Sequence, residues 1–379
     1  MRQFHFSVRP TDVHFHAYRA LEDCRDWQAY HESVSVRDLL SLLLLMAVRN
    51  RSLYGTVRRF FSFSHETASR AIKAQLSTPK QLTDELVQGL HNVMRLSRRE
   101  RRRHWTIAID THNVCYYGKH TPHIIGGQKK QGTKWYFGYA TAVLLHPRHR
   151  YTVALCQVTP GQKPHEIVQT LLDQIASNHL KIKGVAIDSG FDSGETILLL
   201  QKRRLAYVVP LRRKGRGSNA RNRCFEGQHN SVRWTEWLTE RNRLPVRTRV
   251  LLWKGSCRTM AFAFEGWSGS QARNIRETAN RQRLTYRRRF GIETSYRQKY
   301  QAQPKTTSRD PLYRLLLQGV AHLLRQVWVF LTAQIARCRH LKLTAWVGDL
   351  PVEVLLDRIE TVLTDQFPER YANPGKSTT

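Results

Sequence analysis

The spacing of hydrophobic residues divides this 379-residue chain into a helical first part and a second part that alternates strands with helices. Up to residue 104 the apolar residues recur at helical spacing. Segment 36–48 is apolar nearly all round, which predicts a buried core helix. Segments 53–61 and 65–76 form a helix–turn–helix-like pair, and Ser64 is a suitable N-cap for the second helix. We therefore predict a helical N-terminal domain over residues 1–104.

From residue 105 onward, short apolar runs alternate with helical segments, which is typical of an α/β fold with a mixed sheet. The predicted strands are 105–109, 134–146, 150–158, 184–187 and 205–211, with a tight turn at Pro147-Arg148 between the second and the third. The predicted helices are 164–178, 193–203, 272–303 and 312–337. We assign residues 105–211 and 270–340 to this α/β core.

Two further segments lie outside the core. Residues 212–269 are rich in Arg, Gly and Asn at first and then show strand-like runs at 247–253 and 258–264, so we predict a mostly β insertion. Residues 341–379 are expected to hold a helix at 352–363 and a tail, disordered from Asn373.

The charge of the chain points to a polyanionic partner. Lys and Arg number 62 against 29 Asp and Glu, which gives a formal net charge of +33 spread along the sequence. Such a field favours nucleic acid, because a membrane-surface protein usually concentrates its charge on one amphipathic helix. The six cysteines are scattered without metal-ligand or disulfide spacing, which favours a cytoplasmic, nucleoid-associated protein with reduced thiols. The apolar runs 39–48 and 319–336 predict buried helices, not membrane spans.

The second helix of the N-terminal pair carries candidate DNA contacts. Thr67, Ser69, Arg70 and Lys73 face away from its apolar stripe, in the position that suits contacts with a DNA groove. Helical hairpins are common in proteins, so an ordinary packing unit is the alternative.

Three acidic residues stand at positions that suit metal chemistry. Asp110 and Asp188 each follow a short apolar run, and parallel strands present their carboxyl ends at one edge of a sheet. Glu293 lies in a basic predicted helix, on the same face as Tyr286, Arg289 and Tyr300. Such carboxylates suit two Mg²⁺ ions, or Mn²⁺ in their place, which activate a nucleophile and stabilise the leaving oxygen at phosphorus. The alternative for each acid is a helix cap or an ion pair; nearby Asp192 has the pattern of an N-cap.

The segments Ile109-Asp110-Thr111, Ile187-Asp188-Ser189-Gly190-Phe191 and Tyr286-x-x-Arg289-x-x-x-Glu293 resemble the three acidic motifs of insertion-sequence DDE transposases, in the group with a Tyr-Arg-Glu-Lys signature. The resemblance covers residues 105–335. It implies an RNase H-like core with a β-strand insertion, and Asp110, Asp188 and Glu293 as catalytic metal ligands. It also implies Mg²⁺-dependent cut-and-paste transposition by a homodimer in a synaptic complex on terminal inverted repeats, with target DNA as the second DNA partner.

The chain departs from the family pattern at the lysine of the signature. That position is Tyr300 here, and Lys299 comes one residue early, about 120° from the Glu293 face. Arg297 is better placed to contact a DNA phosphate, although a solvated arginine is the alternative. The expected DNA contacts are therefore Tyr286, Arg289, Arg297, Lys299, Arg70 and Lys73.

The tryptophans of the insertion have two interpretations. They either stack on a flipped base or form the core of the insertion itself. These residues are Trp234, Trp237, Trp253 and Trp267.

Three functions fit these features. The first is a DNA transposase that cleaves and joins DNA at the ends of a mobile element. The second is a structure-specific nuclease on the same core, and the third is a non-catalytic DNA-binding protein derived from a transposase. The presence of all three acids argues against the third.

Overall fold

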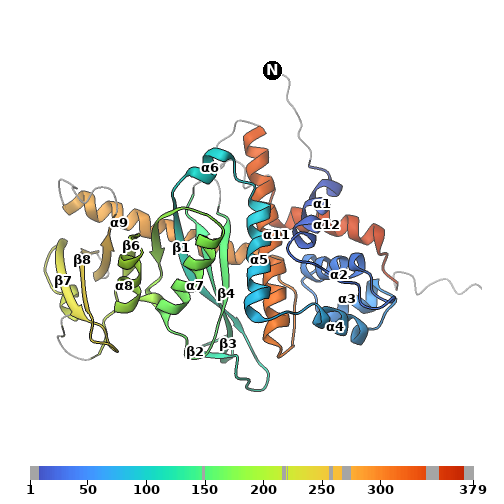
Figure 1. The fold of residues 1–379 in the computed structure, drawn as a ribbon, viewed down its shortest axis with the longest axis horizontal. Coiled ribbons are helices and arrows are strands. Elements are labelled where there is room, and N and C mark those ends of the chain that lie inside the picture. The colour runs from blue at the N-terminus through green and yellow to red at the C-terminus, as the bar shows by residue number, and fades with distance from the viewer. Residues whose placement is uncertain are drawn as a thin grey trace, which may run out of the picture.

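The computed structural model describes residues 8–146, 150–215, 219, 221–255, 259–266, 275–338 and 350–370. It has a mixed sheet with helices on both faces and a cluster of helices at one end (Figure 1). The predicted fold class, α/β with a mixed sheet and a helical N-terminal region, is confirmed. The division into domains stays a prediction. The turn at Pro147-Arg148, the start of the predicted 272–303 helix and the tail from Asn373 lie outside the described residues.

The N-terminal region is helical, as its apolar spacing predicts. Its helices are α1 (Pro10–Glu22), α2 (Val36–Val48), α3 (Leu53–Phe60), α4 (His65–Ala74), α5 (Pro79–Met94) and α6 (Arg98–Arg102). Helix α2 is buried from Leu39 to Val48, and Ser35 and Asp38 cap its first turn reciprocally. Ser64 caps α4 as expected, because its Oγ accepts a hydrogen bond from Thr67 N at 3.1 Å. The C-terminal helix α12 (Val352–Gln366) packs against α1 and α2 in the same cluster.

The sheet runs in the order β2-β3-β1-β5-β6-β9-β8-β7, and β4 also pairs with β3. Strands β1, β5 and β6 are parallel neighbours, and every other pairing is antiparallel. The strands are β1 (Trp105–Cys115), β2 (Ile125–Lys130), β3 (Thr133–Leu144), β4 (Thr152–Val158), β5 (Ile182–Ile187), β6 (Ala206–Pro210), β7 (Ser231–Leu238), β8 (Pro245–Lys254) and β9 (Thr259–Glu265).

The β-rich insertion does not form a separate sheet. Strand β9 pairs with β6 of the core, from Tyr207 opposite Glu265 to Pro210 opposite Phe262, so the insertion lengthens the core sheet. Strands β2 and β7 have no counterpart in the sequence prediction. Most residues of both are exposed or only partly buried, so neither carries the apolar run that marks a buried strand.

Helices α7 (Pro164–Ser177) and α8 (Gly194–Lys202) cover one face of the sheet, and α9 (Ile275–Arg289) and α10 (Gly291–Gln301) cover the other. The sequence predicts a single helix over 272–303, but the structure has two, because α9 ends at Arg289 and α10 begins at Gly291. The long helix α11 (Pro311–Cys338) runs between the sheet and the helical cluster (Figure 1). Its segment Pro311–Ala336 is long and apolar enough to span a membrane, but it is wholly buried in the protein, as expected for a core helix.

The outer edge of β4 is closed by two glutamines. The Gln174 side chain of α7 accepts a hydrogen bond from Leu155 N at 3.1 Å and donates one to Leu155 O at 3.0 Å. Gln326 of α11 does the same at Thr152, with both distances 3.0 Å. The outward backbone groups of Thr152 and Leu155 are thus paired inside the protein, as buried backbone groups must be.

Candidate active site

Strand pairing brings the first two acids together. In the parallel pair β1–β5, Ile109 lies opposite Ile187, and the next residues along the two strands are Asp110 and Asp188. Our expectation that the first strand ends at residue 109 is wrong, because β1 continues to Cys115 in antiparallel pairing with β3. Asp110 therefore lies within the strand, at the point where its parallel neighbour ends.

The third acid joins them through an arginine. Glu293 is in the first turn of α10, and Arg289 is at the end of α9. Arg289 Nη1 lies 3.0 Å from Asp110 Oδ2, and its Nη2 lies 3.2 Å from Asp188 Oδ1 and 3.4 Å from Glu293 Oε1. One guanidinium thus links the three carboxylates that the sequence motifs predict to act together.

The environment of this cluster differs from one acid to the next. The Asp110 side chain is 11% exposed, against 28% for Asp188 and 44% for Glu293. Burial raises the pKa of the Asp110 carboxyl to about 7; Arg289 acts in the opposite direction, and the Asp188 carboxylate adds to the rise. Two backbone donors hold the aspartates in place, since Thr111 N donates to Asp110 at 2.8 Å and Gly190 N donates to Asp188 at 3.2 Å.

Arg289 itself is enclosed. Its guanidinium lies 5.2 Å from the ring centre of Tyr286 and 5.0 Å from that of Phe290, and the residue is 3% exposed. The sequence predicts Tyr286 and Arg289 as DNA contacts. In this structure, however, the guanidinium of Arg289 faces the acids, and Tyr286 is partly buried against the ring of Phe262.

A residue that contacts DNA must lie on the surface, and Lys299 does not. It is 0% exposed, and its Nζ donates a hydrogen bond to Gln318 Oε1 at 2.7 Å and lies 3.1 Å from His112 Nε2. Burial lowers the pKa of Lys299 well below its usual value. Lys299 is buried because the side of α10 that carries it faces the core. Arg297 is exposed on α10, and Arg70 and Lys73 are exposed on α4, so their expected DNA contacts stay predictions.

Asp192 is not the N-cap of α8. Ser193 takes that role, with its Oγ accepting from Thr196 N at 3.0 Å. Asp192 is instead buried, forms an ion pair with Arg221 and accepts a hydrogen bond from Arg212 N at 2.6 Å. Its carboxylate therefore fastens the insertion to the core.

The insertion tryptophans differ in burial. Trp237 is buried in the core, whereas Trp234 is 50% exposed and its ring centre lies 5.2 Å from the guanidinium of Arg247 and 5.1 Å from that of Arg249. Trp253 packs beneath Arg283 of α9 at 5.5 Å. Trp267 lies outside the described residues.

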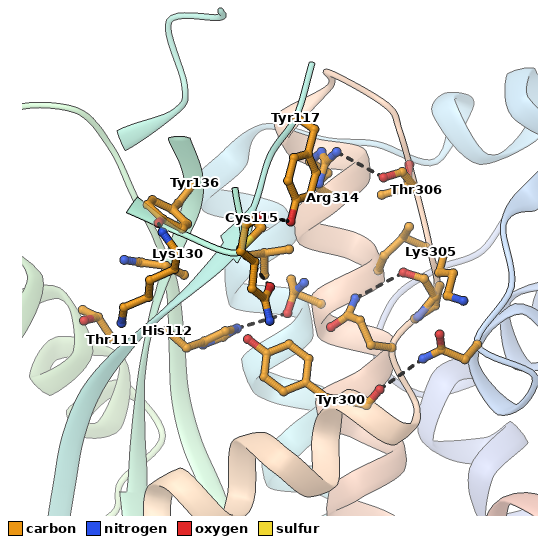
Figure 2. A pocket seen from close by; sticks show the side chains of 18 of the residues that line it. Thr111, His112, Cys115, Tyr117, Lys130, Tyr136, Tyr300, Lys305, Thr306 and Arg314 are labelled. Carbon is orange, nitrogen blue, oxygen red and sulfur yellow. Dashed lines mark hydrogen bonds between the residues drawn. The ribbon is translucent and has the colours of Figure 1, made fainter. Parts of the chain in front are cut away.

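A groove of about 1000 Å³ leads to the acids (Figure 2). Asp110 and Asp188 are among the residues that line it, and His112 and Gln318 lie beside them. The sequence analysis did not find the other polar groups of this active-site groove, because they come from strand and loop positions without a motif. These are Asn50, Tyr117, Lys130, Gln131, Gln303, Lys305 and Thr306.

Comparison with protein families decides the identity. Residues 101–301, more than half of the chain, match the family described as transposase DDE domain. The chain belongs to the transposase DDE domain family. It is thus a DNA transposase, an enzyme that acts on DNA, and enzymes of this family use divalent metal ions.

The fold of this transposase is similar to that of the piggyBac transposase in a cryo-EM structure of its synaptic complex with hairpin DNA. The two share 12% sequence identity with a TM-score of 0.53, over 94% of this chain and 71% of the other. At this identity the likeness shows a common fold only. No curated protein matches the transposase by sequence.

The three carboxylates fit a divalent metal ion in their chemistry, since hard oxygen donors are the ligands that such ions prefer. As placed, however, no three Asp, Glu, His or Cys side chains in the described part of the chain are close enough together to hold a metal ion. The guanidinium of Arg289 accounts for this spacing, because it lies among the three acids and is larger than the ion. The cation in contact with the three acids is therefore the Arg289 guanidinium, a side chain of the protein itself.

Proposed function

We propose that the transposase cleaves DNA at the ends of a mobile element and joins the freed ends to target DNA, with Asp110, Asp188 and Glu293 as its catalytic residues. The observation that carries this proposal is the meeting of these acids around Arg289, two of them on adjacent parallel strands and one on α10. In the metal-loaded enzyme the same three side chains would hold two Mg²⁺ ions, or Mn²⁺ in their place.

The chemistry is phosphoryl transfer. The bound ions supply activation of water or a 3′-hydroxyl and stabilisation of the leaving oxygen. The protein positions the acids: the β1–β5 pairing sets the separation of the two aspartates, and the packing of α10 on Ala108 and Val143 through Ile292 and Tyr296 sets the place of Glu293. The Tyr296 hydroxyl also donates to Asp110 O at 3.0 Å, which ties α10 to the strand beside the acid.

The finer assignment is the group with a Tyr-Arg-Glu-Lys signature. Its support is the expected spacing of Tyr286, Arg289 and Glu293, together with the contacts that Arg289 makes with each of the other two. The partners we propose are the terminal inverted repeats and target DNA, bound by a homodimer in a synaptic complex. We further propose that residues 1–104 recognise the DNA ends, and that the enzyme works in the cytoplasm on the nucleoid.

The test uses DNA that carries the repeats flanking the gene of this transposase. Asp110→Ala, Asp188→Ala and Glu293→Ala should each abolish cleavage and joining in Mg²⁺ and leave DNA binding intact, because binding comes from the basic surface. Asp365→Ala, which changes an exposed acid on α12, is the control and should retain activity. Cleavage that survives in one of the three variants removes that residue from the site, and cleavage without joining by the wild type identifies a nuclease.

A further inference from the structure

The active-site groove has the components of a site for unpaired DNA. Tyr117 and Tyr300 offer rings to it, 68% and 39% exposed, and Figure 2 shows them at opposite sides of the groove. Single strands are bound on such platforms, because every base has a flat face that stacks on an aromatic ring.

Positive charge accompanies the rings. Lys130, at the end of β2, and Lys305, in the loop after α10, are both exposed and line the groove from different sides (Figure 2). Neither forms an ion pair with any residue that the structure describes. Two lysines without an acidic partner, beside a pair of carboxylates, suit the backbone phosphates of a strand that reaches those carboxylates.

The walls that carry these groups are held by contacts inside the protein. Tyr117 donates from its hydroxyl to Gln131 O at 2.9 Å, which joins the chain after β1 to the turn after β2. On the other side, Arg314 of α11 donates to Ser308 O and Thr306 O at 2.5 and 3.2 Å and fixes the loop that holds Lys305. The groove is therefore a preformed feature of the fold.

The groove has room for a few nucleotides. Its volume of about 1000 Å³ is at the upper end of the range of small-ligand sites, roughly 300–1,000 Å³. Bases can stack on the rings of Tyr117 and Tyr300 only when they are unpaired, because in a duplex both faces of each base are already stacked on its neighbours.

We propose that the active-site groove binds an unpaired DNA strand end, with bases on Tyr117 and Tyr300 and phosphates at Lys130 and Lys305. In this position a phosphodiester of the bound strand lies next to Asp110 and Asp188. The proposal rests on the function proposed above and adds the form of the substrate: the DNA is separated into single strands where it enters the site.

The experiment measures binding without cleavage. The full chain in EDTA is titrated against a labelled blunt duplex, and against the same duplex with a short single-stranded extension at the 3′ or the 5′ end, by fluorescence anisotropy. The wild type should bind one extended duplex more tightly than the blunt one. Tyr117→Ala should weaken binding of that duplex about fivefold or more and leave blunt-duplex binding unchanged, which also shows that the variant is folded. Tyr117→Phe keeps the ring but loses the hydroxyl bond to Gln131 O, so it should retain the preference for the extended duplex that Tyr117→Ala loses.

The lysines have a separate readout. Lys130→Ala and Lys305→Ala should each reduce the log–log salt slope of the binding attributable to the extension by about 0.7. Lys202→Ala removes an exposed lysine on α8, at the other face of the sheet, and should leave that slope unchanged.

Equal affinity of the wild type for blunt and extended duplexes overturns the proposal, as does an equal loss on both duplexes in Tyr117→Ala. Neither result touches the proposed function, which is judged by cleavage in Mg²⁺ and by its loss in the acid variants. A strand preference without any cleavage would instead contradict the function and leave the groove as a binding site.

Discussion

Arg289→Met tests whether the guanidinium among the acids stabilises the metal-free protein. The ion pair with Asp110 joins side chains that are 4% and 11% exposed, and removal of one partner from a buried pair costs about 3–5 kcal/mol. The contacts with Asp188 and Glu293 are more exposed and add about 0–1 kcal/mol each. Together these contributions should lower the free energy of unfolding in EDTA by about 3–7 kcal/mol, because methionine fills similar space without charge.

The same variant should respond more strongly to metal. Without the guanidinium the carboxylates have no resident cation to displace, so Mg²⁺ should stabilise Arg289→Met more than the wild type. At a hundred times the dissociation constant of the variant for Mg²⁺, the variant itself gains about 2.7 kcal/mol. Urea unfolding followed by tryptophan fluorescence, in EDTA and in saturating Mg²⁺, measures both effects.

Arg288→Met is the matched control, because Arg288 is the adjacent arginine on α9 and is exposed. It should unfold as the wild type does under both conditions. The reasoning is refuted if Arg289→Met and Arg288→Met lose the same stability in EDTA, or if Mg²⁺ stabilises the wild type as much as Arg289→Met.

Three further predictions concern other parts of the molecule. Lys299→Ala should lower the melting temperature, because it empties a buried site and removes the hydrogen bond that Lys299 donates to Gln318. Arg297→Ala should weaken cleavage at unchanged melting temperature, with partial rescue by Arg297→Lys. Equal melting temperatures of the two alanine variants would contradict this. Gln174→Leu should lower the free energy of unfolding by about 2 kcal/mol or more in urea titrations, because two buried backbone groups of Leu155 lose their partner. Gln88→Leu, at an exposed glutamine of α5, should have little effect. Equal losses in the two variants would contradict the role of Gln174 at the edge of β4. Affinity for duplex DNA should fall with salt with a log–log slope of about −0.9 per phosphate neutralised, and a flat response would exclude an electrostatic interface.

The parts of the fold that the sequence predicts are those with a marked pattern. Helix α2 and strand β5 each contain a marked apolar run. Asp110 and Asp188 follow such runs, so their approach can be inferred from parallel pairing alone. Strand β2 is exposed on both sides and pairs with β3 across a two-residue turn, Gln131-Gly132. Because it buries no face, no apolar run marks it as a strand.

The arginine and lysine of the third motif show a second kind of limit. Helical periodicity places Arg289 on the face of Glu293, and the structure has them 3.4 Å apart. Periodicity cannot show what that face of the helix contacts. In this structure Arg289 on that face contacts Asp110 and Asp188. Likewise the angle of about 120° correctly moves Lys299 off that face, but only the packing of α10 on β1 and α11 shows that the new direction is the protein interior.

The glutamines on the outer edge of β4 bear on how two copies of the transposase can meet. At Thr152 and Leu155 the outward amides and carbonyls are already paired, so these positions offer no template to a strand from another molecule. The remaining edge strands, β2 and β7, carry charges such as Lys129 and Arg233, which are typical of edges that resist strand addition. A continuous intermolecular sheet is therefore disfavoured. The dimer that we propose must be held together by contacts between helices and side chains, or by DNA that both copies bind.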